Sequence, residues 1–148
     1  MTQTANNLNE LIEVLNDGIS FYDDAAKTTE NAGYRSLFLR MATAKRSIAA
    51  DLASHVARHG ETPAEGGTVA GALRKGYAEL RASLSRHPDA RYITQLEETE
   101  DRILAAFQDA MGASEDSAVR HIAQQYLPEV RAMHDEMRAL KREVTRAA

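Results

Sequence analysis

Two acidic residues lie on the apolar stripe of a predicted helix, where they could bind a cation. The stretch QLEETEDRI, residues 95–103, places Glu97 and Glu100 among apolar residues that recur at helical spacing: Ile93, Leu96, Ile103, Leu104, Phe107 and Met111. An ionised carboxylate in a dry core costs several kcal/mol unless something compensates it. The pattern therefore predicts that a cation, a basic side chain, a proton or water lies next to these acids.

The histidines do not complete a motif for two metal ions. In di-metal four-helix bundles, two helices each supply a Glu and the other two each supply Glu-x-x-His, which puts both ligands on one helix face. None of the five histidines follows a glutamate at that spacing: His55, His59, His87, His121 and His134. A complete di-iron motif is therefore absent.

Composition narrows the chemistry further. The 148 residues include no cysteine and no tryptophan, which excludes disulfides, thiolate zinc sites, cysteine-ligated iron–sulfur clusters and thiol nucleophiles. The net charge is −4 and aromatic residues make up 5%, so we expect no nucleic-acid partner. With no leader-like or membrane-spanning stretch, we expect one soluble cytoplasmic domain over residues 1–148, frayed at 1–6 and 146–148, and no membrane partner.

Apolar periodicity and helix breakers predict four long helices and one shorter helix. No segment alternates with period two, so the fold class is all-α. We also expect Pro128 to bend the last helix. The predicted boundaries are Asn7 and Thr28 for the first helix, Gly33 and Gly60 for the second, Thr68 and residue 85 for the short one, Gly112 for the end of the next, and Ser114 as the N-cap of the last.

The connection between the second and third long helices is too long for a simple turn. Tight turns join the helices within each pair, whereas roughly 30 residues separate the pairs, which suits a four-helix bundle with a long, partly helical crossover. Residues 68–85 as a helix would span about 27 Å, most of the length of a bundle. This geometry favours a ferritin-like path over an up-down-up-down one.

Four stretches together resemble a family of small, largely uncharacterised bacterial ferritin-like four-helix-bundle proteins, classed by a domain of unknown function. They are LNELIEVLNDGISFYDDAA, GGTVAGALRKGYAELRASL, QLEETEDRILAAFQDAM and VRAMHDEMRALK. The resemblance covers most of residues 8–141. It implies a metal centre with one acid near the middle of each of the first three long helices and the HD pair of the fourth, and Glu97, Glu100 and His134 match it.

The sequence departs from this pattern on the first two helices. Ile19 and Ala44 stand where the family carries acids, and Lys45 and Arg46 follow Ala44. We therefore expect one polar wall and, opposite it, an apolar wall to which Ile19 and Ala44 contribute. At similar height on the polar wall, the candidate metal ligands are Glu97, Glu100, Glu129 and His134. They suit at most one divalent ion, Fe, Mn or Zn.

Each candidate also has a structural interpretation. For Glu97 and Glu100, pairing with basic side chains or water at a partly open seam is favoured over cation binding. His134, beside Asp135, is explained as a hydrogen-bonded bundle histidine. Tyr22 and Tyr126 at core spacing are best explained as packing residues whose hydroxyls reach a polar partner.

Several function classes follow from this pattern. The first is a ferritin-like bundle with a degenerate metal centre, stress-related or weakly metal-binding, and not an efficient oxidase, so the sequence leans against an enzyme. The second is a structural or interaction module with no metal, forming a homodimer through an exposed helix face or binding a protein partner. A histidine phosphotransfer domain is disfavoured, because Arg58 and Gly60 follow His55 where that class calls for Lys and Gly.

Overall fold

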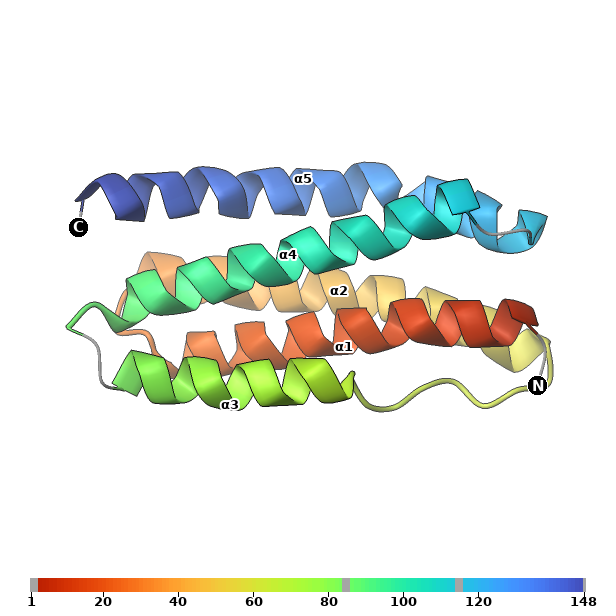
Figure 1. Cartoon of the computed structure of the whole chain (residues 1–148), viewed down its shortest axis with the longest axis horizontal. Helices are drawn as coiled ribbons and strands as arrows, with labels where there is room; N and C mark the ends of the chain where they lie inside the picture. Colours follow the sequence, from red (N-terminus) through yellow and green to blue (C-terminus); the bar gives the residue numbers. More distant parts are fainter. Residues whose placement is uncertain (1–2, 84–85, 114–115, 148) are drawn as a thin grey trace.

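Helices make up nearly the whole of the described chain. The computed structural model describes residues 3–83, 86–113 and 116–147, and these contain five α-helices and no strand (Figure 1). The all-α prediction is therefore confirmed for this part of the chain. The helices are α1 (Gln3–Thr28), α2 (Ala32–Arg58), α3 (Val69–Ser83), α4 (Pro88–Ala113) and α5 (Ser117–Ala147).

The four long helices form two hairpins. α1 packs mainly against α2, and α4 mainly against α5, while α1 and α4 join the two hairpins. The shorter α3 packs against α4 and α1, and it lies alongside one half of α1 in Figure 1. The hairpins and the helical crossover are thus as predicted.

Helix boundaries follow local capping, and one predicted start is wrong. α1 begins at Gln3, four residues before the expected cap Asn7, so the helix extends into the stretch where we expected fraying. At α2 the side chain of Asn31 accepts a hydrogen bond from the backbone N of Tyr34 at 2.9 Å. Gly60 follows α2 with a φ of +74°, the left-handed conformation that ends many helices.

The start of α5 is capped by an acid. The expected cap, Ser114, lies outside the described residues. The carboxylate of Asp116 instead accepts a hydrogen bond from the backbone N of Ala118 at 2.8 Å. It also accepts one from the hydroxyl of Thr4, which ties the start of α5 to the start of α1. Pro128 lies inside α5, and the helix continues through it.

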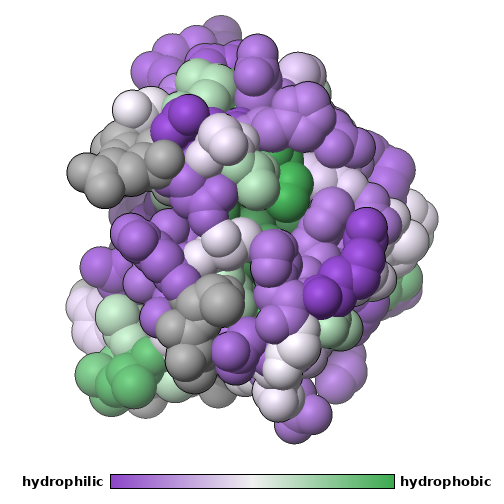
Figure 2. Space-filling view, turned by 90° about the vertical axis from the view of Figure 1, so that its right-hand side faces the viewer, coloured by the Kyte–Doolittle hydropathy of each residue, from purple (hydrophilic) through white to green (hydrophobic). Residues whose placement is uncertain are grey.

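The core contains charged as well as apolar side chains. Its apolar part includes Leu8, Leu15, Tyr22, Phe38, Leu52, Ile93, Leu96, Phe107 and Met137. Buried among them are Asp17, Lys45, Glu97, Glu100 and His134. At the bundle end shown in Figure 2, hydrophilic residues surround a small hydrophobic area. No helix of the described residues is long and apolar enough to cross a membrane.

The segment between α2 and α3 is hydrogen-bonded along α1. Asn9 donates to the carbonyl of Thr62 at 3.2 Å and accepts from the backbone N of Ala64 at 2.8 Å. About two turns further along α1, Asn16 donates to the carbonyl of Gly66 at 3.0 Å. Amide side chains on one face of α1 therefore fix the path of this segment.

A buried carboxylate fixes the start of α3. Asp17 accepts hydrogen bonds from the backbone N and the hydroxyl of Thr68, at 2.9 and 2.6 Å, and the Thr68 hydroxyl in turn accepts from the backbone N of Gly71 at 2.8 Å. This confirms Thr68 as the cap. A Cβ at Gly67 or Gly71 would lie 2.2–2.3 Å from atoms of Asp17, so both glycines are needed for this close approach.

α3 turns its small residues inward and large apolar residues outward. Gly71, Ala78 and Ala82 are buried. Val69 and Leu73, by contrast, are 80% and 72% exposed, and Tyr77 is 57% exposed. Because the contact with Asp17 fixes the helix, α3 cannot rotate to bury these side chains without breaking it.

Candidate metal centre

Glu100 is neutralised by a lysine inside the bundle. Lys45, on α2, is fully buried, and its Nζ lies 2.6 Å from Oε1 and 2.9 Å from Oε2 of Glu100 on α4. The hydroxyl of Tyr22, on α1, donates to Oε2 of Glu100 at 3.2 Å. Both carboxylate oxygens are therefore already bonded to the protein itself.

An aromatic ring and a sulfur atom also lie next to this ion pair. The Nζ of Lys45 lies 4.8 Å from the ring centroid of Tyr22 and 3.5 Å from the sulfur of Met133. Burial lowers the pKa of Lys45, and the charge of Glu100 acts against this shift. Burial, and next the charge of Glu100, raise the pKa of Tyr22 well above its usual value. The phenol therefore stays protonated and remains a donor to Glu100.

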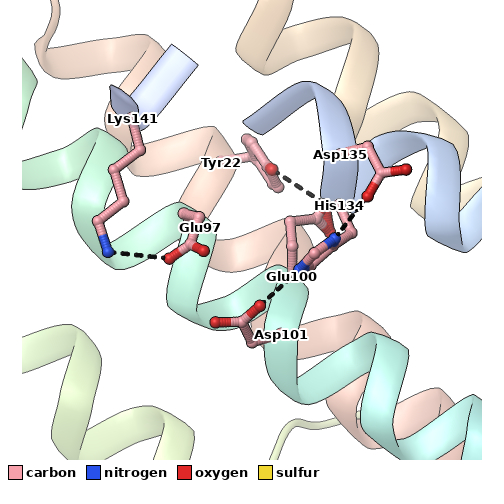
Figure 3. Close-up of polar contacts among 7 residues, drawn as sticks. All are labelled: Tyr22, Glu97, Glu100, Asp101, His134, Asp135 and Lys141. Atoms are coloured by element: carbon pink, nitrogen blue, oxygen red, sulfur yellow. Dashed lines mark hydrogen bonds and ion pairs between the residues drawn. The ribbon is translucent and has the colours of Figure 1, made fainter. Parts of the chain in front are cut away.

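A second polar cluster joins α4 and α5 (Figure 3). Glu97, Asp101 and His134 each offer one ligand atom, and these atoms lie within 4.8 Å of one another. The Nε2 of His134 is 2.6 Å from Oδ1 of Asp101, and its Nδ1 is 3.0 Å from Oδ1 of Asp135. Lys141 donates to Oε2 of Glu97 at 3.2 Å. Unlike the pair at Glu100, this cluster reaches the surface through Asp101, whose side chain is 52% exposed.

Opposing effects act on the pKa of His134. Burial lowers it, but hydrogen bonds and charges from Asp135 and Asp101 outweigh burial, so the pKa lies above its ordinary value. The imidazole therefore keeps its second proton to a higher pH than a free histidine does, and in that form each ring nitrogen has an aspartate as its partner.

The structure separates the four predicted ligands. Glu97 and His134 come together, as the resemblance implied, and Asp101 joins them. Glu100 lies in the Lys45 pair instead. Glu129 is exposed and is not part of the three-residue cluster.

The prediction of an apolar wall on the first two helices, opposite these acids, is wrong. Ile19 and Ala44 are only half-buried, and the side chains that reach Glu100 from the first two helices are those of Tyr22 and Lys45. The physical reason is that Lys45 carries its charge to Glu100 along a fully buried stem. The opposite wall therefore supplies the compensating cation itself.

Sequence reasoning did not identify Lys45 and Asp101 as members of these polar clusters, although the spacing of both residues indicates their helix faces. Lys45 follows Met41 by four residues and precedes Ile48 by three, so it lies on the apolar face of α2. Asp101 follows Glu97 by four residues and therefore shares a helix face with it. The predicted hydroxyl partners of Tyr22 and Tyr126 are confirmed as Glu100 and Asp51.

The donors present fit one divalent ion and not two. Two carboxylates and one imidazole are suitable ligands for Zn, Mn or Fe. An ion held by Glu97, Asp101 and His134 would replace the ammonium of Lys141 and the imidazole proton. Glu100 cannot complete a second position, because Lys45 and Tyr22 already bond both of its oxygens.

A protein-family model described as Domain of unknown function (DUF2383) matches residues 3–113. The chain belongs to this family. The DUF2383 match covers α1 to α4 and ends where α4 ends, so it includes Lys45, Glu97 and Glu100, whereas His134 on α5 lies beyond it. The resemblance to a family of unknown function is thereby confirmed. No curated protein matches the chain.

Proposed function

We propose that the protein is a ferritin-like bundle with a degenerate metal centre, which binds at most one divalent ion weakly and is not an efficient oxidase. The observation that carries this proposal is the buried ammonium of Lys45 bonded to Glu100. The side-chain nitrogen of Lys45, bonded to Glu100, occupies the bundle interior, where a di-metal bundle places its ions. A second ion there would face like-charge repulsion and would lack a free carboxylate.

The remaining cluster supports weak binding of a single ion. Glu97, Asp101 and His134 offer three donors, and three protein ligands leave open positions for water. The competing contacts from Lys141 and Asp135 must be broken first, and this cost lowers the affinity. Chemistry that needs two irons would therefore be absent.

Titration of metal-free protein with Co(II), followed by visible absorption, tests this proposal. We expect one ion per chain, and we expect Asp101→Asn and His134→Gln to abolish the signal. Asp101 is half exposed, so its variant should keep the fold. Glu129→Gln is the matched control, because Glu129 is exposed and outside the cluster. Two irons bound per chain, with oxygen consumption after ferrous iron is added, would overturn the proposal.

The second candidate is an interaction module that forms a homodimer without metal. The exposed side chains of Val69, Leu73 and Tyr77 on α3 favour it, because the contact of Asp17 with Thr68 keeps this face outward. A two-fold axis would place the same stripe of two copies together. Light scattering at rising concentration tests this, with Leu73→Lys expected to give monomers. A wild-type mass of one chain at all concentrations contradicts it.

A further inference from the structure

A groove beside the candidate metal cluster has an unusual charge distribution. It lies between α4 and α5, has a volume of about 660 Å³, and is lined by Glu97 and Asp101 on one side and by Arg138, Arg142 and Arg146 on the other. Lys141 also contributes to its wall. Such a volume falls within the range of sites for small organic ligands, about 300–1,000 Å³.

The acids of this groove already have partners within the protein. Lys141 pairs with Glu97 at 3.2 Å, and His134 pairs with Asp101 at 2.6 Å. None of the three arginines, in contrast, pairs with a carboxylate of the described residues. The groove therefore presents three guanidinium groups whose charge the protein itself leaves uncompensated.

The arginines are spaced to contact more than one anionic group. Arg138, Arg142 and Arg146 follow one another at intervals of four residues, so they share a face of α5 and lie about 6 Å apart along its axis. A guanidinium binds carboxylate or phosphate through paired N–H donors. A ligand with one anionic group reaches only part of this row, whereas one with two or three groups reaches all of it.

We propose that this groove binds a small molecule that carries two or more phosphate or carboxylate groups. Arg138 and Arg142 hold two of the anionic groups, and Arg146 at the end of α5 contacts a third. The site does not rest on the metal proposal, because the arginines attract the anion whether or not an ion occupies the neighbouring cluster.

Calorimetric titration of inorganic triphosphate into protein freed of metal with a chelating resin tests the proposal. A soluble chelator is avoided because it is itself a multiply charged anion. We expect one triphosphate per chain, and at least tenfold weaker binding of orthophosphate at the same ionic strength. A parallel titration with citrate shows whether phosphate or carboxylate groups are preferred, since both belong to the proposed ligand class.

Variants separate a site from a general attraction to basic protein. Arg138→Gln and Arg142→Gln should each weaken triphosphate binding about tenfold or more, while circular dichroism shows an unchanged fold. Arg74→Gln is the matched control, because Arg74 is an exposed arginine on α3. It should change the affinity less than twofold. A dissociation constant above about 1 mM at low salt, or an equal loss in the Arg74 variant, would overturn the proposal.

Discussion

Glu97 and Glu100 lie three residues apart on α4, yet their charges are compensated in opposite ways. Glu100 is 2% exposed and meets a fully buried lysine and a buried tyrosine. Glu97 is 6% exposed, but its partner Lys141 keeps 35% of its side chain in solvent. The same residue type on one helix therefore belongs to a closed ion pair in one case and to an open cluster in the other.

The difference shows that the burial of the partner, more than that of the acid, decides what a buried carboxylate can do. An ion pair closed on both sides is costly to break and offers nothing to a ligand. A pair whose cation reaches water can exchange that cation for another at a lower cost than a closed pair can. Ligand chemistry is therefore expected at Glu97, and stability effects at Glu100.

Breaking the closed pair should have the largest effect. Lys45→Met leaves Glu100 buried without its cation, and we expect the free energy of unfolding to fall by about 3–5 kcal/mol in urea titrations. The double variant Lys45→Met with Glu100→Leu removes both charges and should regain most of this loss. Equal losses in the single and double variants would show that the pair is not what stabilises the centre.

The third buried carboxylate, Asp17, provides an intermediate case. Gly71→Ala would place a Cβ 2.3 Å from the carboxylate of Asp17, which hydrogen bonds to Thr68 hold in place. We therefore expect the free energy of unfolding to fall by about 1–3 kcal/mol. Gly76→Ala on the same helix meets nothing within 4 Å and should be neutral or stabilising by up to about 1 kcal/mol. In thermal melts the Gly71 variant should have a lower melting temperature than the unmodified protein, and the Gly76 variant an equal or higher one.

Removing the cation of the open cluster should have a smaller effect. Lys141→Met takes a partly exposed ammonium away from Glu97, and solvent screening limits the loss to less than about 1 kcal/mol in urea titrations. A loss as large as that of the Lys45 variant would contradict the distinction between a closed and an open site.

An acid near the surface should have the smallest effect, visible only at low pH. The hydroxyl of Thr4, followed by backbone N–H groups of α5, lowers the pKa of Asp116 below 3.8. Its contribution to stability is therefore present above pH 3.8 and is lost as the pH falls through the lowered pKa. Urea titrations between pH 2 and 6 should show a shallower acid decline for Asp116→Asn, and an unchanged slope would contradict this assignment.

Sequence alone could predict most of the fold because apolar spacing and breakers are local signals. It placed the two hairpins and the cap at Thr68, and it indicated that Glu97 and Glu100 needed compensation. The identity of the compensating groups depended on contacts between helices, which no local spacing defines. The spacing of Lys45 from Met41 and Ile48 places it on the apolar face of α2, but only the position of Glu100 on α4 identifies it as the compensating cation.

The hydrogen bonds that Asn9 and Asn16 make with residues 62–66 have a consequence for proteolysis. By composition this glycine- and proline-containing segment resembles a preferred cleavage site. A protease, however, must draw an extended stretch of chain into its cleft, and here the backbone is bound to α1 at Thr62, Ala64 and Gly66. Cleavage therefore requires local release of this segment. Its rate depends on how strongly the side chains of Asn9 and Asn16 hydrogen-bond to the segment, and less on how exposed the segment is.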